Sequence, residues 1–139
     1  MSEDDHEREV APGARLGRAA GVAGVVVAVL VVAIVHQYAI GQTQAAAAES
    51  DAGRSDWTSA ITHARAAAEA AAPGSRWPDE GFRRLEAIGH DAEARADGRT
   101  ALLAFGAMLT ATSERFGMGP WHARAEIALA RLGQRDSDR

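Results

Sequence analysis

The stretch RLGRAAGVAGVVVAVLVVAIVHQYAI, residues 15–40, decides the fold class of this chain. Every residue from Ala19 to Val35 is apolar or glycine, and the first charged residue after the stretch is Glu49. Counted from Ala19 to Ile40, the run has 22 residues. A helix of that length measures about 33 Å, which is enough to cross a bilayer core of about 30 Å. We therefore expect residues 15–40 to form a transmembrane helix in a lipid bilayer.

A cleaved signal peptide is the alternative to a retained anchor. The run QAAAAES, residues 44–50, offers small residues at an A-x-A-like cleavage site, for example Ala46 and Ala48. Against cleavage, the 18-residue leader contains five acidic residues. The apolar run also exceeds a usual signal core of about 7–15 residues. We expect the segment to be retained, and a secreted helical protein is the alternative.

The positions of the arginines predict the orientation of the span. Arg15 and Arg18 lie directly at its N-terminal end, and the next positive residue after it is Arg54. Basic residues near a span favour the cytoplasmic side, whereas acidic residues contribute little. We expect a single-pass protein of the cell (inner) membrane with a cytoplasmic N-terminus. Its C-terminal domain is then periplasmic or extracellular.

Small residues form one face of the predicted span. Gly17, Gly21, Gly24 and Ala28 are spaced so that they share one side of a helix. Small residues let two transmembrane helices approach closely, so this is a candidate packing face for a second helix, of this chain or another. The alternative is that glycine and alanine are simply common in such spans.

The composition excludes several classes of protein. The 139 residues suffice for one small domain plus an appendage. The net charge of −4 gives no basic face for nucleic acid. The absence of cysteine excludes disulfides, zinc–thiolate sites and cysteine nucleophiles. No zincin, hydrolase-elbow, P-loop or dinucleotide motif occurs, so we expect no enzyme, no cofactor and no small-molecule substrate.

Histidine and acidic residues recur at helical spacing in the C-terminal half. The pairs are Glu86/His90, His90/Glu93 and His122/Glu126. Such pairs offer two ligands to a metal ion, but they more commonly form a surface hydrogen bond or ion pair. We expect no metal site.

The remaining chain divides into a helical domain and polar connections. We expect a disordered cytoplasmic tail at residues 1–14, a linker at 41–55 and a disordered tail at 134–139. An extension of the membrane helix by a turn or two through the alanine run of the linker, until Gly53 interrupts it, is the alternative for that segment. Between them, residues 56–133 show apolar residues at helical spacing and no polar–apolar alternation of the kind strands show. Four helices are predicted, over residues 55–73, 78–98, 99–119 and 119–134. The first has Ser55 or Asp56 as its N-cap. The third has these residues on its buried side: Ala101, Leu102, Phe105, Met108 and Leu109. The expected fold is all-α, with a transmembrane helix followed by about four antiparallel helices.

The stretch LEAIGHDAEARADGRTALLAFGAML, residues 85–109, resembles a tetratricopeptide repeat. The characteristic places of the repeat are filled by Leu85, Ile88-Gly89, Ala92, Ala96-Asp97, Ala101, Phe105 and Met108. The preceding segment from Asp56 to Pro73 resembles the second helix of such a repeat, and WHARAEIALARLG resembles a following first helix or a capping helix. The resemblance implies about one full repeat flanked by half-repeats, with small residues where paired helices approach.

The sequence departs from the repeat in its spacing. Ala60 and Ala101 lie 41 residues apart, whereas the repeat has a period of about 34 residues. A plain four-helix domain with alanine-rich helices is the alternative fold.

Two functions follow for a membrane-anchored helical domain. The first is a protein-interaction adaptor that binds other membrane or periplasmic proteins. In the repeat family the first helices line the concave face, which makes Phe82, Arg83, Glu86 and Trp121 candidate partner-binding residues. The second is an accessory subunit of a larger membrane complex, recognised mainly through its transmembrane helix.

Overall fold

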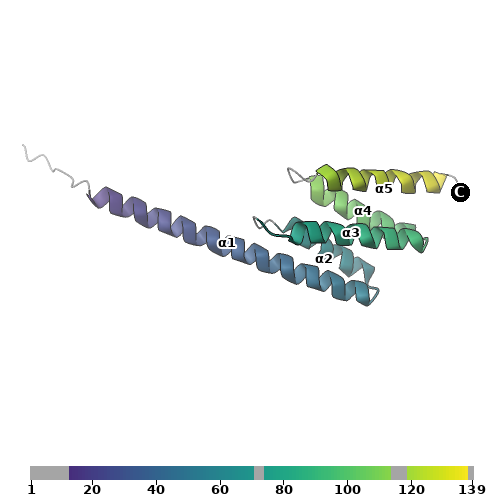
Figure 1. Cartoon of the computed structure of the whole chain (residues 1–139), viewed down its shortest axis with the longest axis horizontal. Coiled ribbons are helices and arrows are strands. Elements are labelled where there is room, and N and C mark those ends of the chain that lie inside the picture. The colour runs from purple at the N-terminus through teal and green to yellow at the C-terminus, as the bar shows by residue number, and fades with distance from the viewer. Residues whose placement is uncertain (1–12, 71–73, 114–118, 138–139) are drawn as a thin grey trace, which may run out of the picture. The chain divides into compact units, whose positions relative to one another are not determined.

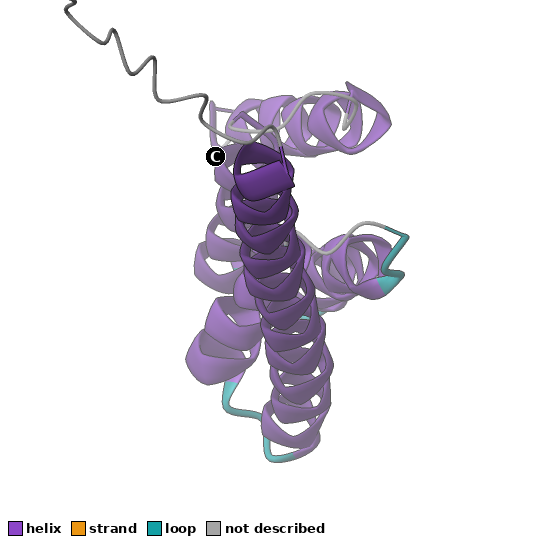
Figure 2. Cartoon of the chain, turned by 90° about the vertical axis from the view of Figure 1, so that its left-hand side faces the viewer, coloured by secondary structure: helices purple, strands orange, loops and turns teal. Residues whose placement is uncertain are grey.

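The structure is a computed structural model that describes residues 13–70, 74–113 and 119–137. Across these residues it contains five helices and no strand (Figures 1 and 2). The helices are α1 (Gly13–Gly53), α2 (Trp57–Glu69), α3 (Trp77–Ala94), α4 (Gly98–Ser113) and α5 (Gly119–Ser137). The predicted all-α fold with a long apolar N-terminal helix is confirmed. Whether the hairpins belong to the tetratricopeptide class stays a prediction.

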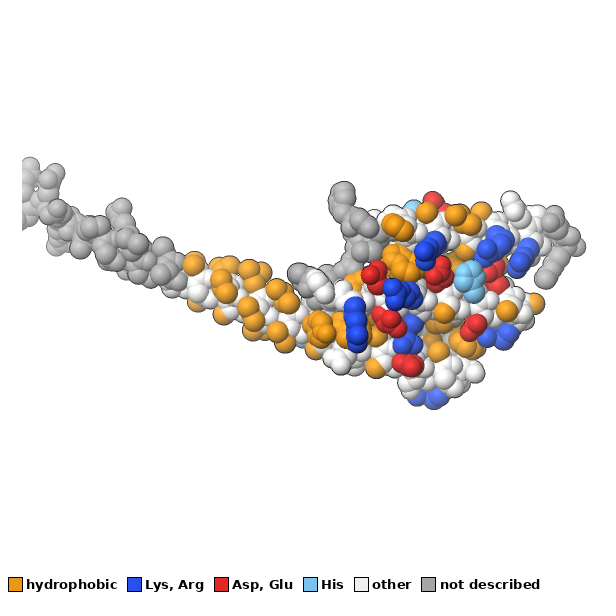
Figure 3. All heavy atoms as spheres, viewed as in Figure 1, with side chains coloured by type: hydrophobic (Ala, Val, Ile, Leu, Met, Phe, Trp, Pro, Cys, Tyr) orange, Lys and Arg blue, Asp and Glu red, His pale blue; other side chains and the backbone are white. Residues whose placement is uncertain are grey.

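The chain divides into two compact units, and the boundary in the sequence lies between Ala33 and Ile34. In the first unit, every side chain described from Gly21 to Ala33 is exposed. Figure 3 shows apolar side chains covering this part of α1. Among the described residues, one helical segment, Gly21–Gly53, is long and apolar enough to cross a membrane. An isolated helix of this composition satisfies its backbone hydrogen bonds internally, as a bilayer core requires.

The second unit begins with the end of α1, and residues 41–53 of the predicted linker 41–55 belong to this helix. Helix α1 continues through Gly53, and its residues Gly41, Ala45 and Ala48 are buried. These small residues lie at helical spacing on one side of α1 and let other helices approach its backbone. Ala45 packs in one cluster with Ala67 and Trp77, and Ala48 belongs to the main core. A stripe of small residues thus makes this segment part of the domain.

The direction of the helices follows from paired contacts. On α1, Gly41 lies against Trp77 of α3, and eight residues later Glu49 pairs with Arg84 of α3. Because both contacts advance along the two helices together, α3 runs in the same direction as α1. Along α5, Trp121 stacks on Phe82 of α3, and three and ten residues later Arg124 and Arg131 pair with glutamates of α3. Helices α3 and α5 therefore run parallel. Helix α4 lies between them in the chain and packs against both.

The core combines four large side chains with many alanines. Phe82, Leu85, Phe105 and Met108 are the largest fully buried residues. Glycines allow the helices to approach closely around them, because a Cβ atom placed at Gly81 would lie 2.3 Å from the backbone nitrogen of Ala68. Because the small residues let the helix backbones pack closely, four large side chains are enough to fill the core.

Helix boundaries differ from the predicted ones mainly at the C-terminal ends. Helix α3 begins one residue earlier than predicted, at Trp77, and ends at Ala94 where Ala96 adopts a φ of 58°. Helix α5 continues to Ser137, so the predicted tail 134–139 is wrong for residues 134–137. The predicted tail 1–14 lies outside the described residues up to residue 12, and its last two residues belong to α1. Predicted helical residues 71–73 and 114–118 also lie outside the described part.

Candidate interaction surfaces

The predicted transmembrane packing face is open on the described part of α1. A Cβ atom placed at Gly21 or Gly24 would meet no other atom within 4 Å, and Ala28 is exposed. Gly17 lies in α1, but its surroundings are outside the described side chains. The face is accessible to a second helix, and its use for helix association stays a prediction.

The predicted partner-binding residues on α3 and α5 do not form one exposed surface. Phe82 is fully buried and its ring stacks on Trp121, with ring centroids 5.6 Å apart and planes 19° from parallel. Phe82 is therefore a core residue and cannot contact a partner directly. Trp121 is half-buried, and its indole nitrogen donates a hydrogen bond to Asp79 Oδ1 over 3.2 Å. The stack joins α3 to α5.

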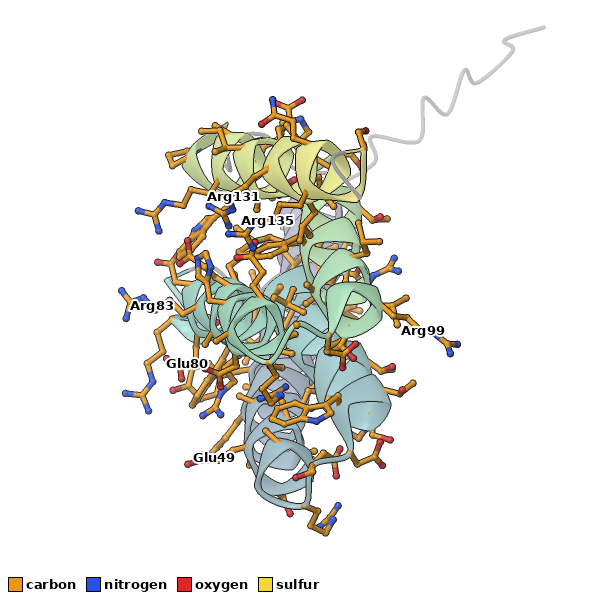
Figure 4. All side chains as sticks on the ribbon, turned by 90° about the vertical axis from the view of Figure 1, so that its right-hand side faces the viewer. Glu49, Glu80, Arg83, Arg99, Arg131 and Arg135 are labelled. Atoms are coloured by element: carbon orange, nitrogen blue, oxygen red, sulfur yellow. The ribbon has the colours of Figure 1, made fainter. Side chains whose placement is uncertain are left out.

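The two charged candidates on α3 differ in their surroundings. Glu86 accepts a 3.4 Å hydrogen bond from Arg124 of α5, whose guanidinium also lies 4.8 Å from the ring centroid of Trp121. Arg83 is exposed and makes no ion pair with any residue that the structure describes. Figure 4 shows it extending away from the helices. Of the four predicted residues, Arg83 is the most accessible.

Glu93 holds the C-terminal halves of α3 and α5 together. Its carboxylate accepts hydrogen bonds from Arg131 at 2.6 and 3.0 Å and lies 3.6 Å from an Arg135 nitrogen. Figure 4 shows both arginines beside the end of α3. Burial opposes ionisation of Glu93, but the hydrogen bonds from Arg131 and His90 outweigh it and hold the pKa of the carboxyl below its ordinary value. This half-buried carboxylate stays ionised at neutral pH and joins α3 to α5.

An apolar hollow of about 610 Å³ opens beside this ion cluster. Its large apolar lining residues are Leu102 and Leu103 of α4 and Leu132 of α5, and its charged lining residues are Glu93, Arg99 and Arg135. Leu102 and Leu103 are 50% and 49% exposed. Leu102 was expected on the buried side of its helix, but the positions of α3 and α5 leave it uncovered. The adjacent leucines are the sequence signal for this surface, since neighbouring positions on a helix point in different directions and one buried stripe rarely takes both.

The junction of α1 with α2 and α3 was also missed from the sequence. Tyr38 and Trp77 meet edge to face with ring centroids 5.7 Å apart, and a Cβ atom at Gly41 would lie 2.8 Å from the Trp77 ring. At the other end of the junction, buried Asp51 binds His63 Nδ1 over 2.6 Å and also pairs with Arg54. The sequence signal is the small-residue spacing that continues beyond the apolar run.

Metal-ligating side chains do not gather in the described part of the chain, where no group of three histidine or acidic residues is close enough to hold an ion. The predicted pairs have other contacts. His90 lies 3.0 Å from Glu93, and His122 contacts Thr112 at 2.9 Å as well as Glu126 at 3.5 Å. Glu86 is engaged by an arginine instead of by His90.

Comparison with known proteins gave no match: no protein-family model, curated protein or solved structure matches this chain. The resemblance of residues 85–109 to a tetratricopeptide repeat therefore depends on the residues of this sequence alone.

Proposed function

We propose that the chain is a single-pass membrane protein that presents a helical domain for binding other proteins. The apolar first unit supports the anchor, because large exposed side chains such as Val22 and Val25 are stable in lipid and costly in water. The arginines before the span support a cytoplasmic N-terminus and an extracytoplasmic domain. In a Gram-negative cell that domain is periplasmic.

The proposed domain class is a short tetratricopeptide-like array. Its support is the α3–α4 hairpin, where Gly89 faces the aromatic ring that the repeat places in its second helix. A Cβ atom at Gly89 would lie 2.5 Å from Phe105 Cζ, so the position accepts only glycine without movement of the ring. Each hairpin of such an array buries its apolar stripe against its neighbours.

The observation that carries the adaptor function is the leucine-lined hollow between α4 and α5. The described large apolar residues that are exposed outside α1 are Leu102, Leu103 and Ile127, and two of these three line the hollow. Concave, mostly apolar sites with a few polar lining groups are where partner side chains anchor. We propose that this hollow receives an apolar side chain of a membrane or periplasmic protein.

The test compares two exposed aliphatic residues on the same domain, Leu103 and Ile127. The full chain, tagged at its C-terminus, is purified from membranes in mild detergent, and the co-purifying proteins are identified with their stoichiometry. Leu103→Glu is expected to abolish co-purification of the partner. Ile127→Glu is the matched control, since Ile127 is 66% exposed and does not line the hollow. Equal loss in both variants, or in neither, would contradict the proposed site.

An accessory-subunit function is the second candidate, supported by the open face at Gly21 and Gly24. Under this function another subunit's transmembrane helix packs on α1. Replacing both glycines by isoleucine is expected to abolish assembly, because the branched side chains prevent close helix approach. If the hollow carries recognition, the same double variant retains its partner and Leu103→Glu loses it.

A further inference from the structure

The junction between α1 and α3 places part of the helical domain at a defined distance from the end of the apolar run. Tyr38 contacts the Trp77 ring, and Trp77 also covers Gly41. These residues and the exposed apolar residues Ile34 and Val35 all belong to the same compact unit. The packing of Trp77 therefore ties the start of α3 to the last residues of the proposed span, which ends at residue 40, and to Gly41 directly after it.

Helix geometry gives the depth of this contact. Tyr38 lies two residues before Ile40, the last residue of the proposed span, which is about 3 Å along a helix. Tyrosine and tryptophan are enriched at this depth, where an apolar ring meets lipid and a polar group meets water. Tyr38 is 47% exposed, so one side of its ring packs against Trp77 and the rest is accessible to lipid or water.

Arg76 is the charged residue at this junction that has no ion pair among the described residues. Its guanidinium lies 4.7 Å from the centroid of the Trp77 ring, and the side chain is exposed. The acidic residues that follow on α3 are engaged, since Asp79 accepts from Trp121 and Glu80 pairs with Arg84. An arginine supplies several donors in a planar fork that matches phosphate.

We propose that the start of α3 rests on the membrane surface, with Tyr38 and Arg76 in the headgroup layer and Arg76 bound to phospholipid phosphate. The inference depends on the proposed span. It adds a second membrane contact, through which lipid headgroups hold the helical domain against the bilayer. The hydrogen-bonding partner is the phosphate group that phospholipids share.

The opposite end of the junction provides an internal control. Asp56 donates its backbone N–H to the Asp51 carbonyl over 2.9 Å, so Trp57 lies near the level of residue 51 on α1. Trp77 lies at the level of Gly41. Ten residues of helix separate these levels, which is about 15 Å. The two tryptophans therefore report two different heights along α1.

The first measurement is fluorescence quenching of single-tryptophan variants of the full chain in phospholipid vesicles. One variant keeps only Trp77 and the other keeps only Trp57, with phenylalanine at the remaining tryptophan positions. Insertion is checked by resistance to alkaline carbonate, and folding by circular dichroism. Lipids with a nitroxide at the headgroup are expected to quench most of the Trp77 emission and to leave that of Trp57 nearly unchanged.

The second measurement uses the cysteine-free sequence and keeps all tryptophans. Arg76→Cys and Arg83→Cys each introduce one site for a nitroxide label on the same helix. The label at residue 76 is expected to show the collision profile of the headgroup layer, with reduced access to a water-soluble nickel complex. The label at residue 83 is expected to be fully accessible to the nickel complex.

The outcomes separate this inference from the proposed span. A chain that carbonate extracts from the vesicles refutes the span, and the surface contact with it. A chain that resists carbonate but shows equal quenching of Trp77 and Trp57, or equal nickel access at residues 76 and 83, retains the span and overturns the surface contact. Phosphate binding by Arg76 is tested by Arg76→Gln, which is expected to weaken the quenching that headgroup-labelled lipid causes at Trp77, whereas Arg83→Gln leaves it unchanged.

Discussion

The close approach of α2 and α3 at Gly81 gives the sharpest prediction about stability. A Cβ atom at this position would lie 2.3 Å from Ala68 N, 2.6 Å from Ala64 O and 2.8 Å from Ala68 Cα. Ordinary contacts of a Cβ atom are 3.4–4 Å, so Gly81→Ala requires the two helices to separate by about 1 Å. All three atoms belong to backbone, and no side-chain rotation relieves the contact.

The magnitude is the difference between two opposing effects. Alanine favours the helical state over glycine by about 1 kcal/mol in the interior of a helix. Overpacking a tight site costs about 1–3 kcal/mol, and a contact against backbone belongs at the upper end of that range. The net effect of Gly81→Ala is a loss of about 2 kcal/mol, which lowers the melting temperature of a domain of this size by roughly 8–16 °C.

Gly106→Ala is the matched control, because Gly106 is also inside a helix and a Cβ atom there would meet nothing within 4 Å. It is expected to gain about 1 kcal/mol and to raise the melting temperature by roughly 4–8 °C. Both variants are measured as the full chain in detergent, by the loss of helical circular dichroism on heating. If Gly81→Ala melts at the same temperature as Gly106→Ala or higher, the close approach of α2 and α3 is refuted.

Three further predictions concern α3 and its neighbours. Hydrogen bonds from Arg131 help to keep the pKa of Glu93 below its ordinary value, so the ionised carboxylate stabilises the folded chain. This contribution to the free energy of unfolding is present above about pH 4.3 and is lost as the pH falls through the lower pKa of the folded state. Glu93→Gln is expected to show a smaller fall in melting temperature on acidification than the native chain, and an equal fall contradicts this role. Gly89→Ala is expected to destabilise the native chain more than a Phe105→Leu background, since the smaller side chain makes room for the added methyl, and additive effects in a double-mutant cycle of melts count against the contact. Ala96→Gly is expected to raise stability by up to about 1 kcal/mol, because the φ of 58° strains an L-residue and not glycine, and a lower melting temperature argues against that conformation.

Helix content was predictable because its signals are local. The apolar run from Ala19 to Val35, the aspartate before Trp57 and the proline at residue 78 act within a few residues of themselves. Asp56 indeed caps α2 by accepting from the Ser59 N–H. These features set where helices occur, whatever the helices later contact.

The candidate site was predictable only in part, because burial depends on residues far apart in the sequence. Phe82 lies on the apolar face of its own helix, but a helical wheel does not show what covers that face. Its ring is covered by Trp121, which lies 39 residues later in the sequence. Leu102 is the reverse case, since its helix stripe predicts burial and no helix covers it. A helical wheel gives the direction of each side chain around one helix, but it does not show which other helix, if any, packs against that side.

The sequence alone determined that this chain is helical, that one segment is long and apolar enough to cross a membrane, and where most of the helices begin. These properties depend on contiguous composition and on capping residues. The packing of α1 against Trp77 through Gly41 and Ala45, and the hollow between α4 and α5, depend on tertiary contacts that the sequence did not predict. Small residues carry little hydrophobic signal of their own, and their effect appears only where another helix packs against them.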